Sequence, residues 1–465
     1  METKVITFSI KNLDFSKILF YVIVFAVALG ISFGYGLYSG KERNWVFRFL
    51  KSIKEDVKVV SEEATTISKV RPKHFIHPAR YDGSGVTVNK TGPDNDELVL
   101  LSGFFKDTNE LRLIQRNGDI VVRWKVKFSE IFPDPSYLES PPSTDWNIDT
   151  HGAVALPDGS IVFNFDYGGL VKIDRCGHVL WTHESPSHHS IELAEGGGFW
   201  VPGRIYHKAG KPSPFPPFPL PFVEDTIMKI SGDGTLISEI SVPQLFYDSD
   251  LESLLTSTGE DIESKPTWDK ELLHLNKIAE LKSDIADDFP LFNAGDLLLS
   301  LRKYNMLFVV DPETKTIKWW KIGPWVRQHD PEFIPGGKIV VFNNNSYRTA
   351  FGDGPDISSL DTPRVSNIIE LDPVTGKHRI IYGGKPDQEL LTVIRGKHEY
   401  LSGGGLLITE FEGGRVLETD ASGQILWEYI NRYKKGEVAE ITEARLYPAN
   451  YFNVTDWSCE GQSIK

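Results

Sequence analysis

The sequence predicts an all-β fold, a six-bladed β-propeller, preceded by one N-terminal transmembrane helix and a helical stalk. Three observations lead to this prediction. Segments of roughly forty residues repeat one plan of four short strands, as propeller blades do. The chain of 465 residues contains 40 Gly and 28 Pro and is 12% aromatic, a composition rich in turns and strands. One apolar stretch without any charged residue, 18–38, stands near the N-terminus.

Composition and charge narrow the function classes. Hydrophobic residues make up 40% of the chain and charged residues 25%, which is typical of a globular protein rather than a disordered one. The formal net charge is −14. Because a nucleic-acid partner requires a cationic surface, we expect no nucleic acid among the partners.

The N-terminal region divides into a tail (1–17), a transmembrane helix (18–38) and a stalk with a connection (39–94). The stretch 18–38 is long enough to cross a bilayer as a helix, and Tyr21, Tyr35 and Tyr38 lie towards its ends, where interface aromatics are common. We expect an uncleaved single-pass anchor, with a cleaved signal sequence as the alternative. Positive charges flank both ends, so the loop charges do not decide the orientation.

The stalk is expected over 44–68, where apolar residues recur at helical spacing. These residues are Trp45, Phe49, Ile53 and Val57. A polar connection with Pro and Gly follows, and the propeller domain is expected over 95–465.

The repeated plan begins at residue 97. The first segment covers 97–126, four further segments each begin at a histidine, and the sixth contains the apolar strand 406–409 and the strand 423–427. A row of β-sandwiches is the alternative architecture, but it would not explain one plan repeated along the chain.

The histidines occupy equivalent starts of the first strand in four segments. They are His151, His189, His274 and His329. Arg302 ends a returning strand, and Asn276 stands two residues after His274, so we expect it on the same face of that strand. Because the first strands surround the propeller axis, these side chains should converge at one mouth of the central channel.

Such a group suits the chemistry of an oxyanion. A neutral imidazole can attack an electrophile, and the guanidinium fork of Arg302 can hold a tetrahedral oxyanion. A metal site built from the same histidines is the alternative, but no close His-x-His pair supports it, and we expect no metal. Each histidine alone is also compatible with a hydrogen bond to a neighbouring turn and no function.

Three insertions are expected on the side of the histidines: 211–222, 247–269 and 346–365. The first is rich in Pro and Phe and can either form one wall of an aromatic-binding pocket or serve as a rigid lip without ligand contact. The two cysteines, Cys176 and Cys459, form no Cys-x-x-Cys motif, which argues against a thiolate zinc site. They are expected either as one disulfide, if the domain is outside the cytoplasm, or as two buried thiols.

Several motifs resemble the bacterial arylsulfotransferase family, six-bladed propeller enzymes of the periplasm. They are His274-Leu-Asn276, Leu299-Ser-Leu-Arg302, Gln328-His329-Asp330-Pro-Glu-Phe333, and the segments 414–429 and 445–451. The similarity covers roughly 97–452 and implies transfer of a sulfuryl group without a nucleotide donor.

The resemblance also implies residue roles. His329 matches the histidine that takes the sulfuryl group, and His274, Asn276 and Arg302 match residues that bind the sulfate oxygens or act as acid and base. The pair His188-His189 matches a further histidine of the family; strand counting selects His189, which we expect to be catalytic.

We therefore expect a membrane-anchored enzyme with the propeller in the periplasm or outside the cell. His151 and His188 are expected to contact substrate. The expected partners are an aryl sulfate, a phenolic acceptor, the membrane and a second copy of the chain, without any cofactor. The alternative is a non-catalytic tethered propeller that binds a polysaccharide or a protein. A quinone-dependent dehydrogenase would require more blades and a calcium–quinone site, and the sequence indicates neither.

Overall fold

The computed structural model describes residues 15–42, 72–92, 95–208, 212–215, 218, 220–256, 273–345, 366–448 and 450–459. The chain divides into two compact units, Met1–Arg71 and Pro72–Lys465. The stalk predicted over 44–68, most of the predicted tail, and the insertion 346–365 lie outside the described residues.

The first unit contains one described helix, α1 (Phe15–Glu42). Its segment Leu19–Gly36 is long and apolar enough to cross a membrane, and its large apolar side chains are exposed. A helix of 28 residues is about 42 Å long, which exceeds the roughly 30 Å of a bilayer's hydrocarbon core. By length and composition, α1 is therefore suited to be a membrane span, although a signal sequence would have the same properties.

The second unit is mostly β, and its described part contains six antiparallel sheets of four or five strands. The first three sheets have these orders: β28 (Ile441–Tyr447), β3 (Leu98–Phe105), β4 (Thr108–Gln115), β5 (Ile120–Val126); β6 (Thr150–Ala155), β7 (Ile161–Phe165), β8 (Gly169–Ile173), β9 (Val179–His183); and β10 (Glu192–Leu193), β11 (Phe199–His207), β12 (Phe222–Ile230), β13 (Leu236–Ser241).

The other three sheets have these orders: β14 (Leu275–Glu280), β15 (Leu297–Leu301), β16 (Met306–Asp311), β17 (Thr316–Ile322); β18 (His329–Ile334), β19 (Lys338–Asn343), β20 (Asn367–Leu371), β21 (His378–Tyr382); and β2 (Gly85–Asn89), β25 (Ile425–Ile430), β24 (Arg415–Thr419), β23 (Leu406–Glu410), β22 (Lys397–Tyr400). A further small sheet joins β1 (Ile76–Pro78), β27 (Glu437–Ala439) and β26 (Arg432–Lys434). The short helices of this unit are η1 (Lys73–Phe75), α3 (Phe128–Ile131), α4 (Val242–Asp248), η2 (Glu252–Thr256), η3 (Ala286–Asp288) and η4 (Arg302–Tyr304).

Each of the six sheets packs on the next through its own cluster of buried apolar side chains. Trp124 and Phe163, for example, belong to the cluster between the first two sheets. The same holds for each following pair. The last sheet packs on the first through a cluster that contains Val99 and Trp427. The packing is therefore cyclic and propeller-like, since alternating apolar faces bury themselves between neighbouring sheets.

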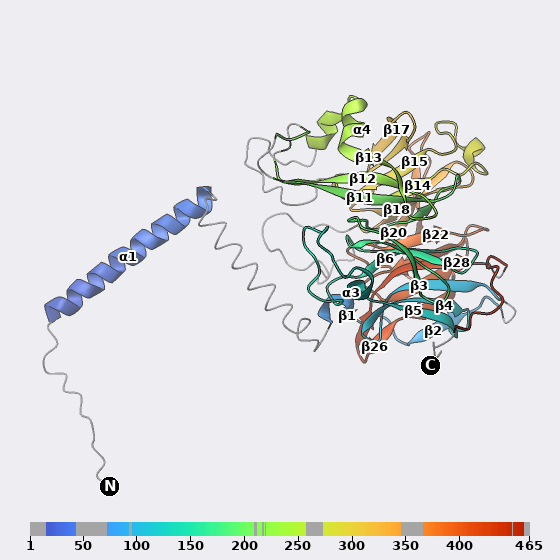
Figure 1. Ribbon diagram of the computed structural model, residues 1–465, viewed down its shortest axis with the longest axis horizontal. Helices are drawn as coiled ribbons and strands as arrows, with labels where there is room; N and C mark the ends of the chain where they lie inside the picture. The colour runs from blue at the N-terminus through green and yellow to red at the C-terminus, as the bar shows by residue number, and fades with distance from the viewer. Residues whose placement is uncertain are drawn as a thin grey trace, which may run out of the picture. The chain divides into compact units, whose positions relative to one another are not determined.

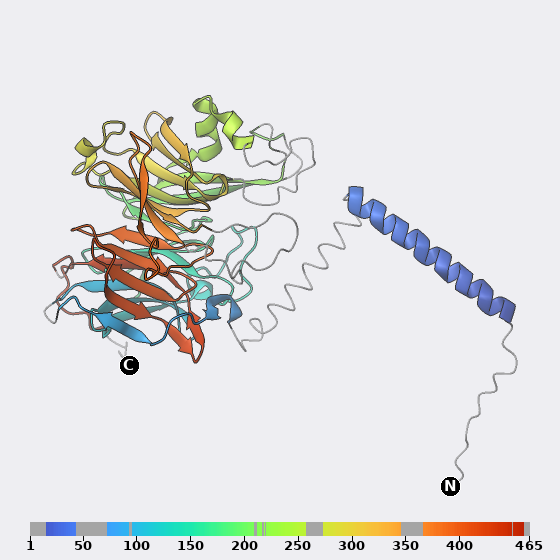
Figure 2. The same ribbon diagram turned by 180° about the vertical axis from the view of Figure 1, so that it is seen from behind.

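The first and last parts of this unit are joined by strand pairing. The late strand β28 pairs with β3 and supplies the edge strand that the first repeat lacks (Figure 1). From behind, the early strand β2 lies beside β25 (Figure 2). The sequence predicts only a connection up to residue 94, whereas the structure places 76–78 and 85–89 in strands of the second unit.

The edge strands β6, β14, β18 and β28 share a local irregularity near their first residues. The register shifts at Thr150/Ala153, Leu275/Lys277, His329/Glu332 and Ile441/Glu443. A β-bulge inserts an extra residue and changes the direction of side chains, and bulges are common beside functional sites. Three of these four shifts lie at or next to a predicted site histidine.

Cys176 and Cys459 form a disulfide, with Cα atoms 5.6 Å apart. The disulfide decides between the two alternatives that the sequence leaves open. It ties the turn between β8 and β9 to the C-terminal segment, where Arg175 Nη1 also donates to the carbonyl oxygens of Asp456 (2.9 Å) and Ser458 (3.0 Å). The cross-link reduces the freedom of the unfolded chain, which stabilises the folded state.

The insertion rich in Pro and Phe joins β11 to β12. Its described aromatic residues Phe215 and Phe218 are buried in the core cluster that also contains α4 and Phe222. The Phe215 ring lies 5.9 Å from that of Tyr247 and 6.1 Å from that of Phe222. These two phenylalanines therefore stabilise the loop itself, which favours the rigid lip over a wall of a ligand pocket.

Candidate functional site

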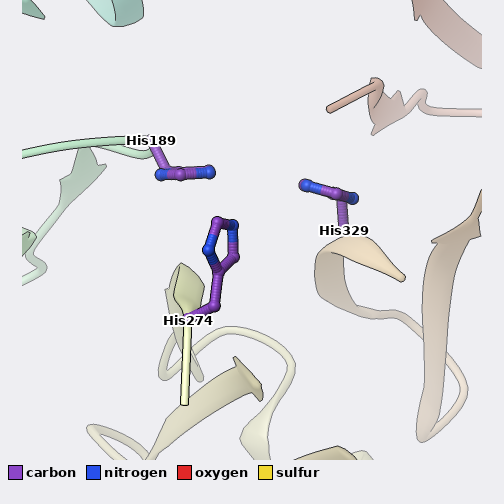
Figure 3. Close-up of side chains that lie close together, drawn as sticks. All are labelled: His189, His274 and His329. Carbon is purple, nitrogen blue, oxygen red and sulfur yellow. The ribbon is translucent and has the colours of Figure 1, made fainter. Parts of the chain in front are cut away.

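Three histidines from three sheets lie together, as the sequence predicts. His189 precedes β10, His274 precedes β14, and His329 is the first residue of β18; their rings approach one another in Figure 3. One ring nitrogen of each lies within 4.8 Å of one ring nitrogen of the others. The His189 ring centroid is 5.0 Å from that of His274 and 6.1 Å from that of His329. At most 6% of each residue is exposed, so the cluster is buried.

The backbone at two of these histidines adopts an unusual conformation. The φ angles are 58° at His189 and 63° at His274, in the left-handed region. A residue other than glycine costs about 1 kcal/mol or more in this conformation, and such residues are common at functional sites. Both residues stand just before an edge strand, where this conformation changes the direction of the ring.

The hydrogen bonds of His329 determine which ring nitrogen is available. Its Nδ1 lies 2.6 Å from Asn344 Oδ1 and 3.1 Å from the carbonyl oxygen of Arg327. The orientation of the Asn344 amide is fixed, because its Nδ2 donates to the carbonyl oxygens of Thr392 and Arg395. Both neighbours of Nδ1 are thus acceptors, so Nδ1 carries the hydrogen and the lone pair is on Nε2.

Electrostatics keep the rings of His189 and His329 neutral. Burial, followed by the charge of Arg302, lowers the pKa of His329 well below its usual value. Burial, followed by the neighbouring histidines, likewise lowers the pKa of His189. At neutral pH each of these two imidazoles therefore has an unprotonated ring nitrogen, which a nucleophile or a base requires.

Arg302 brings a cation to the cluster. It is the first residue of η4, directly after β15, and its backbone N–H donates to the carbonyl oxygen of His274 (3.1 Å). Its Nη1 lies 3.4 Å from His274 Nε2. A guanidinium beside neutral imidazoles favours an anionic ligand, whose charge it balances.

Asn276 lies at a bulge and contacts the backbone beside His329. Its Nδ2 donates to the carbonyl oxygen of Gln328 (2.8 Å), the residue before His329, while its Oδ1 is buried without a hydrogen-bond partner among the described residues. The bulge between Leu275 and Lys277 interrupts the alternation on which the predicted shared face with His274 rests. Asn276 thus supports the backbone that carries His329.

The two further histidines of the prediction contact His189. The His151 ring centroid is 4.3 Å from that of His189, and His151 Nδ1 donates to Asp166 Oδ1 (3.0 Å). His188 Nδ1 and His189 Nδ1 are 2.7 Å apart, so one donates to the other. Both residues are buried, and they orient His189 from two sides.

Sequence reasoning misses two residues that orient the cluster, Asp166 and Asn344. Asp166 directly follows β7, and Asn344 directly follows β19, as Arg302 follows β15. Asp166 Oδ2 also accepts from Arg395 Nη2 (2.9 Å). The repeated plan contains a signal for them, because the first residue after the second strand occupies the same position in three sheets.

Comparison with known proteins identifies the family. The model of the family described as Arylsulfotransferase (ASST) matches residues 152–432. The chain belongs to the arylsulfotransferase (ASST) family. The matched range includes His189, His274, Arg302 and His329. No curated protein matches the chain.

Three solved structures resemble this arylsulfotransferase-family chain at low sequence identity. A protein of unknown function from Bacteroides caccae is 13% identical, with 76% of this chain and 99% of that chain covered and a TM-score of 0.45. The β-propeller domain of Cps50 (Swd1) from Myceliophteria thermophila is 9% identical, with 76% and 88% covered and a TM-score of 0.39. Virginiamycin B lyase from Staphylococcus aureus is 11% identical, with 77% and 98% covered and a TM-score of 0.37. Likeness at this level carries no argument about activity.

Proposed function

We propose that this chain is a membrane-anchored arylsulfotransferase that moves a sulfuryl group from an aryl sulfate to a phenol through a sulfohistidine at His329. One observation carries the proposal: a buried, neutral His329 whose Nδ1–H is bound to Asn344 and whose cluster contains the Arg302 guanidinium. A neutral nucleophile beside a cation is the arrangement that transfer from an anionic sulfate ester requires.

In the first step, the Nε2 lone pair of His329 attacks the sulfur atom of the donor. The N–S bond forms while the S–O bond to the aryl group breaks, and the phenolate leaves with the electron pair of that bond. Arg302 balances the negative charge on the sulfuryl oxygens, and the Asn344 oxygen stabilises the positive charge that develops on the His329 ring.

In the second step, the oxygen atom of the phenolic acceptor attacks the same sulfur atom. The S–O bond forms, the N–S bond breaks, and its electron pair returns to His329 Nε2. The proton of the acceptor passes to a neutral imidazole of the cluster, for which His189 and His274 are the candidates. No cofactor enters either step, and the mechanism predicts ping-pong kinetics.

The same proposal covers the architecture and the location. The six cyclically packed sheets are interpreted as the six blades of a propeller, and α1 as its membrane anchor. A disulfide supports a compartment outside the cytoplasm, because cytosolic thiols are kept reduced. The propeller is therefore proposed to be in the periplasm or outside the cell.

The test is transfer from 4-nitrophenyl sulfate to a phenol by the full-length protein in detergent. His329→Asn should reduce the rate by about a thousandfold or more, because the covalent step is lost. A radiolabelled sulfate donor should label the wild type on His329 and leave the variant unlabelled. The matched control is His378→Asn, an exposed histidine of β21, which should retain full activity. Equal rates for wild type and His329→Asn would refute the proposed nucleophile.

A further inference from the structure

We propose that His189, His274 and His329 also form a binding site for a first-row transition-metal ion such as Zn²⁺ or Co²⁺, and that the ion and the sulfuryl group exclude each other. The site is built from residues that lie 85 and 55 positions apart along the chain. The inference goes beyond the transferase activity, because metal binding requires no donor or acceptor.

Geometry and ligand chemistry favour the ion. The ligand atoms of the three rings lie within 4.8 Å of one another, and all three residues are buried. Zinc–imidazole bonds of about 2.0–2.1 Å place the nitrogens of a tetrahedral site about 3.4 Å apart, so small ring rotations suffice. Three imidazoles without a thiolate suit zinc, copper, nickel and cobalt, and they leave a fourth position open.

The surroundings of the three rings resemble those of metal ligands. The Nδ1–H of His329 donates to Asn344, which directs the Nε2 lone pair toward the cluster. Asp225 Oδ2 accepts from the backbone N–H of His274 (2.8 Å), which holds the strained turn that presents this ring.

A second set of potential ligands competes for the ion. His151, Asp166 and His189 also have ligand atoms within 4.8 Å of one another. In that set, however, Asp166 already accepts from both Arg395 and His151. A dication there would stand beside the Arg395 charge and would have to displace a buried ion pair, so the set of three histidines is preferred.

Arg302 makes metal binding depend on an anion. Its Nη1 is 3.4 Å from His274 Nε2, so a dication bound to the three histidines would be repelled by the guanidinium. An oxyanion on the open coordination position relieves this repulsion. Sulfate should therefore increase the affinity for the ion in the wild type, and Arg302→Met should abolish that dependence.

The experiment is a titration of chelator-treated full-length protein, purified in detergent with a tag free of histidine, with Co²⁺ and no donor present. The expected result is one Co²⁺ per chain with intense visible absorption bands, which tetrahedral cobalt shows and octahedral aqueous cobalt does not. Zn²⁺ should displace the cobalt and remove the bands. Each of His189→Gln, His274→Gln and His329→Gln should weaken binding by about a hundredfold or more, since a ligand is lost.

The controls separate the two ligand sets and the two proposals. His378→Gln, at the exposed histidine of β21, should retain the bands. If His151→Gln and Asp166→Asn abolish the bands while His329→Gln does not, the proposed site is wrong. Absence of bands in the wild type would also overturn it, whatever the folding of the variants. Because the titration contains no sulfate donor, its result neither supports nor refutes the transferase proposal, which the transfer assay tests separately. In the transfer assay, Zn²⁺ should inhibit, because the bound ion occupies the Nε2 lone pair of His329 that attacks the sulfur atom.

Discussion

Burial shifts the pKa values of different side chains at two places along the edge strands. One place is the beginning of the strands, and the other is a cavity further along the same strands. At the beginnings, buried imidazoles lose their protons beside Arg302. Further along lies a cavity of about 150 Å³ lined by many charged residues, among them Glu332, His398 and Glu399. There, burial raises the pKa of Glu332 to about 8 and that of Glu399 to about 6. Burial thus neutralises bases in one region and acids in the other.

Two buried ion pairs connect the cavity wall to the histidine end, since Lys277, Asp330 and Glu443 also line the cavity. Lys277 Nζ is 3.0 Å from Asp330 Oδ1, and Lys397 Nζ is 2.5 Å from Glu443 Oε2. Lys397 also donates to the carbonyl oxygen of His189 (3.1 Å), and Asp330 directly follows His329. The same strands therefore carry a buried histidine cluster at one end and an acidic cavity further along, and paired charges connect the two.

The largest expected effect is at the histidine end. Arg302→Met should reduce kcat/KM for 4-nitrophenyl sulfate by about 10²–10³-fold, because the cation that balances the sulfuryl oxygens is lost. Arg302→Lys should recover part of this loss, since it retains charge without the planar fork. Steady-state kinetics measure both. If Arg302→Met leaves kcat/KM unchanged, Arg302 does not bind the anion, and the proposed difference between the two regions is wrong.

The next effect is on the ion pairs between the regions. Asp330→Asn leaves Lys277 buried without its partner and should destabilise the folded state by about 3 kcal/mol or more. Denaturant unfolding measures the loss. The double variant Asp330→Asn/Lys277→Met should recover much of it, since no charge then remains buried. Equal stability of the wild type and the single variant would show that the pair does not stabilise the fold.

A smaller effect tests the tautomer of His329. Asn344→Leu removes the acceptor of the Nδ1–H and should reduce the transfer rate by about 10–100-fold. The pH profile should change as well, because the hydrogen is no longer held on Nδ1. Asn345→Leu, at the neighbouring position, serves as the comparison. If both variants have the same activity and profile, Asn344 does not select the tautomer.

The smallest effect belongs to the acidic cavity. Burial, with the neighbouring charge of Glu399 and against that of Lys277, raises the pKa of Glu332 to about 8, whereas an unfolded glutamate titrates near about 4.3. At pH values between these two pKa values, Glu332 is protonated in the folded state and ionised in the unfolded state. The stability that protonated Glu332 contributes is therefore lost as pH rises. Glu332→Gln should reduce this decline by about 1 kcal/mol, as urea unfolding at pH 5 and pH 8 would show. The exposed Glu313→Gln should leave the decline unchanged, and an unchanged decline in Glu332→Gln would contradict the shift.

The sequence predicts those site residues that occupy the same position in several repeats. His189, His274 and His329 start equivalent strands, and the structure brings them together. Asp166 and Asn344 occupy the position of Arg302 in other sheets, but an acidic or amide residue after a strand also fits an ordinary turn. Their role became evident only from their hydrogen bonds.

Other features depend on contacts that a local pattern does not contain. The bulge at Leu275/Lys277 breaks the alternation used to place Asn276. The Cys176–Cys459 disulfide joins residues 283 positions apart, and the pairing of β28 with β3 joins residues still further apart in sequence. Periodicity predicts a strand, but its partner follows from the whole arrangement of sheets.

The pairing of β28 with β3 has a consequence for synthesis of the protein. Until residues 441–447 have left the ribosome, the first sheet has an unpaired edge along β3. An open edge can pair with another chain, so the nascent protein is exposed to aggregation for most of its translation. Ring closure therefore has to follow synthesis, and truncation before residue 441 should give a product that associates rather than a smaller soluble ring.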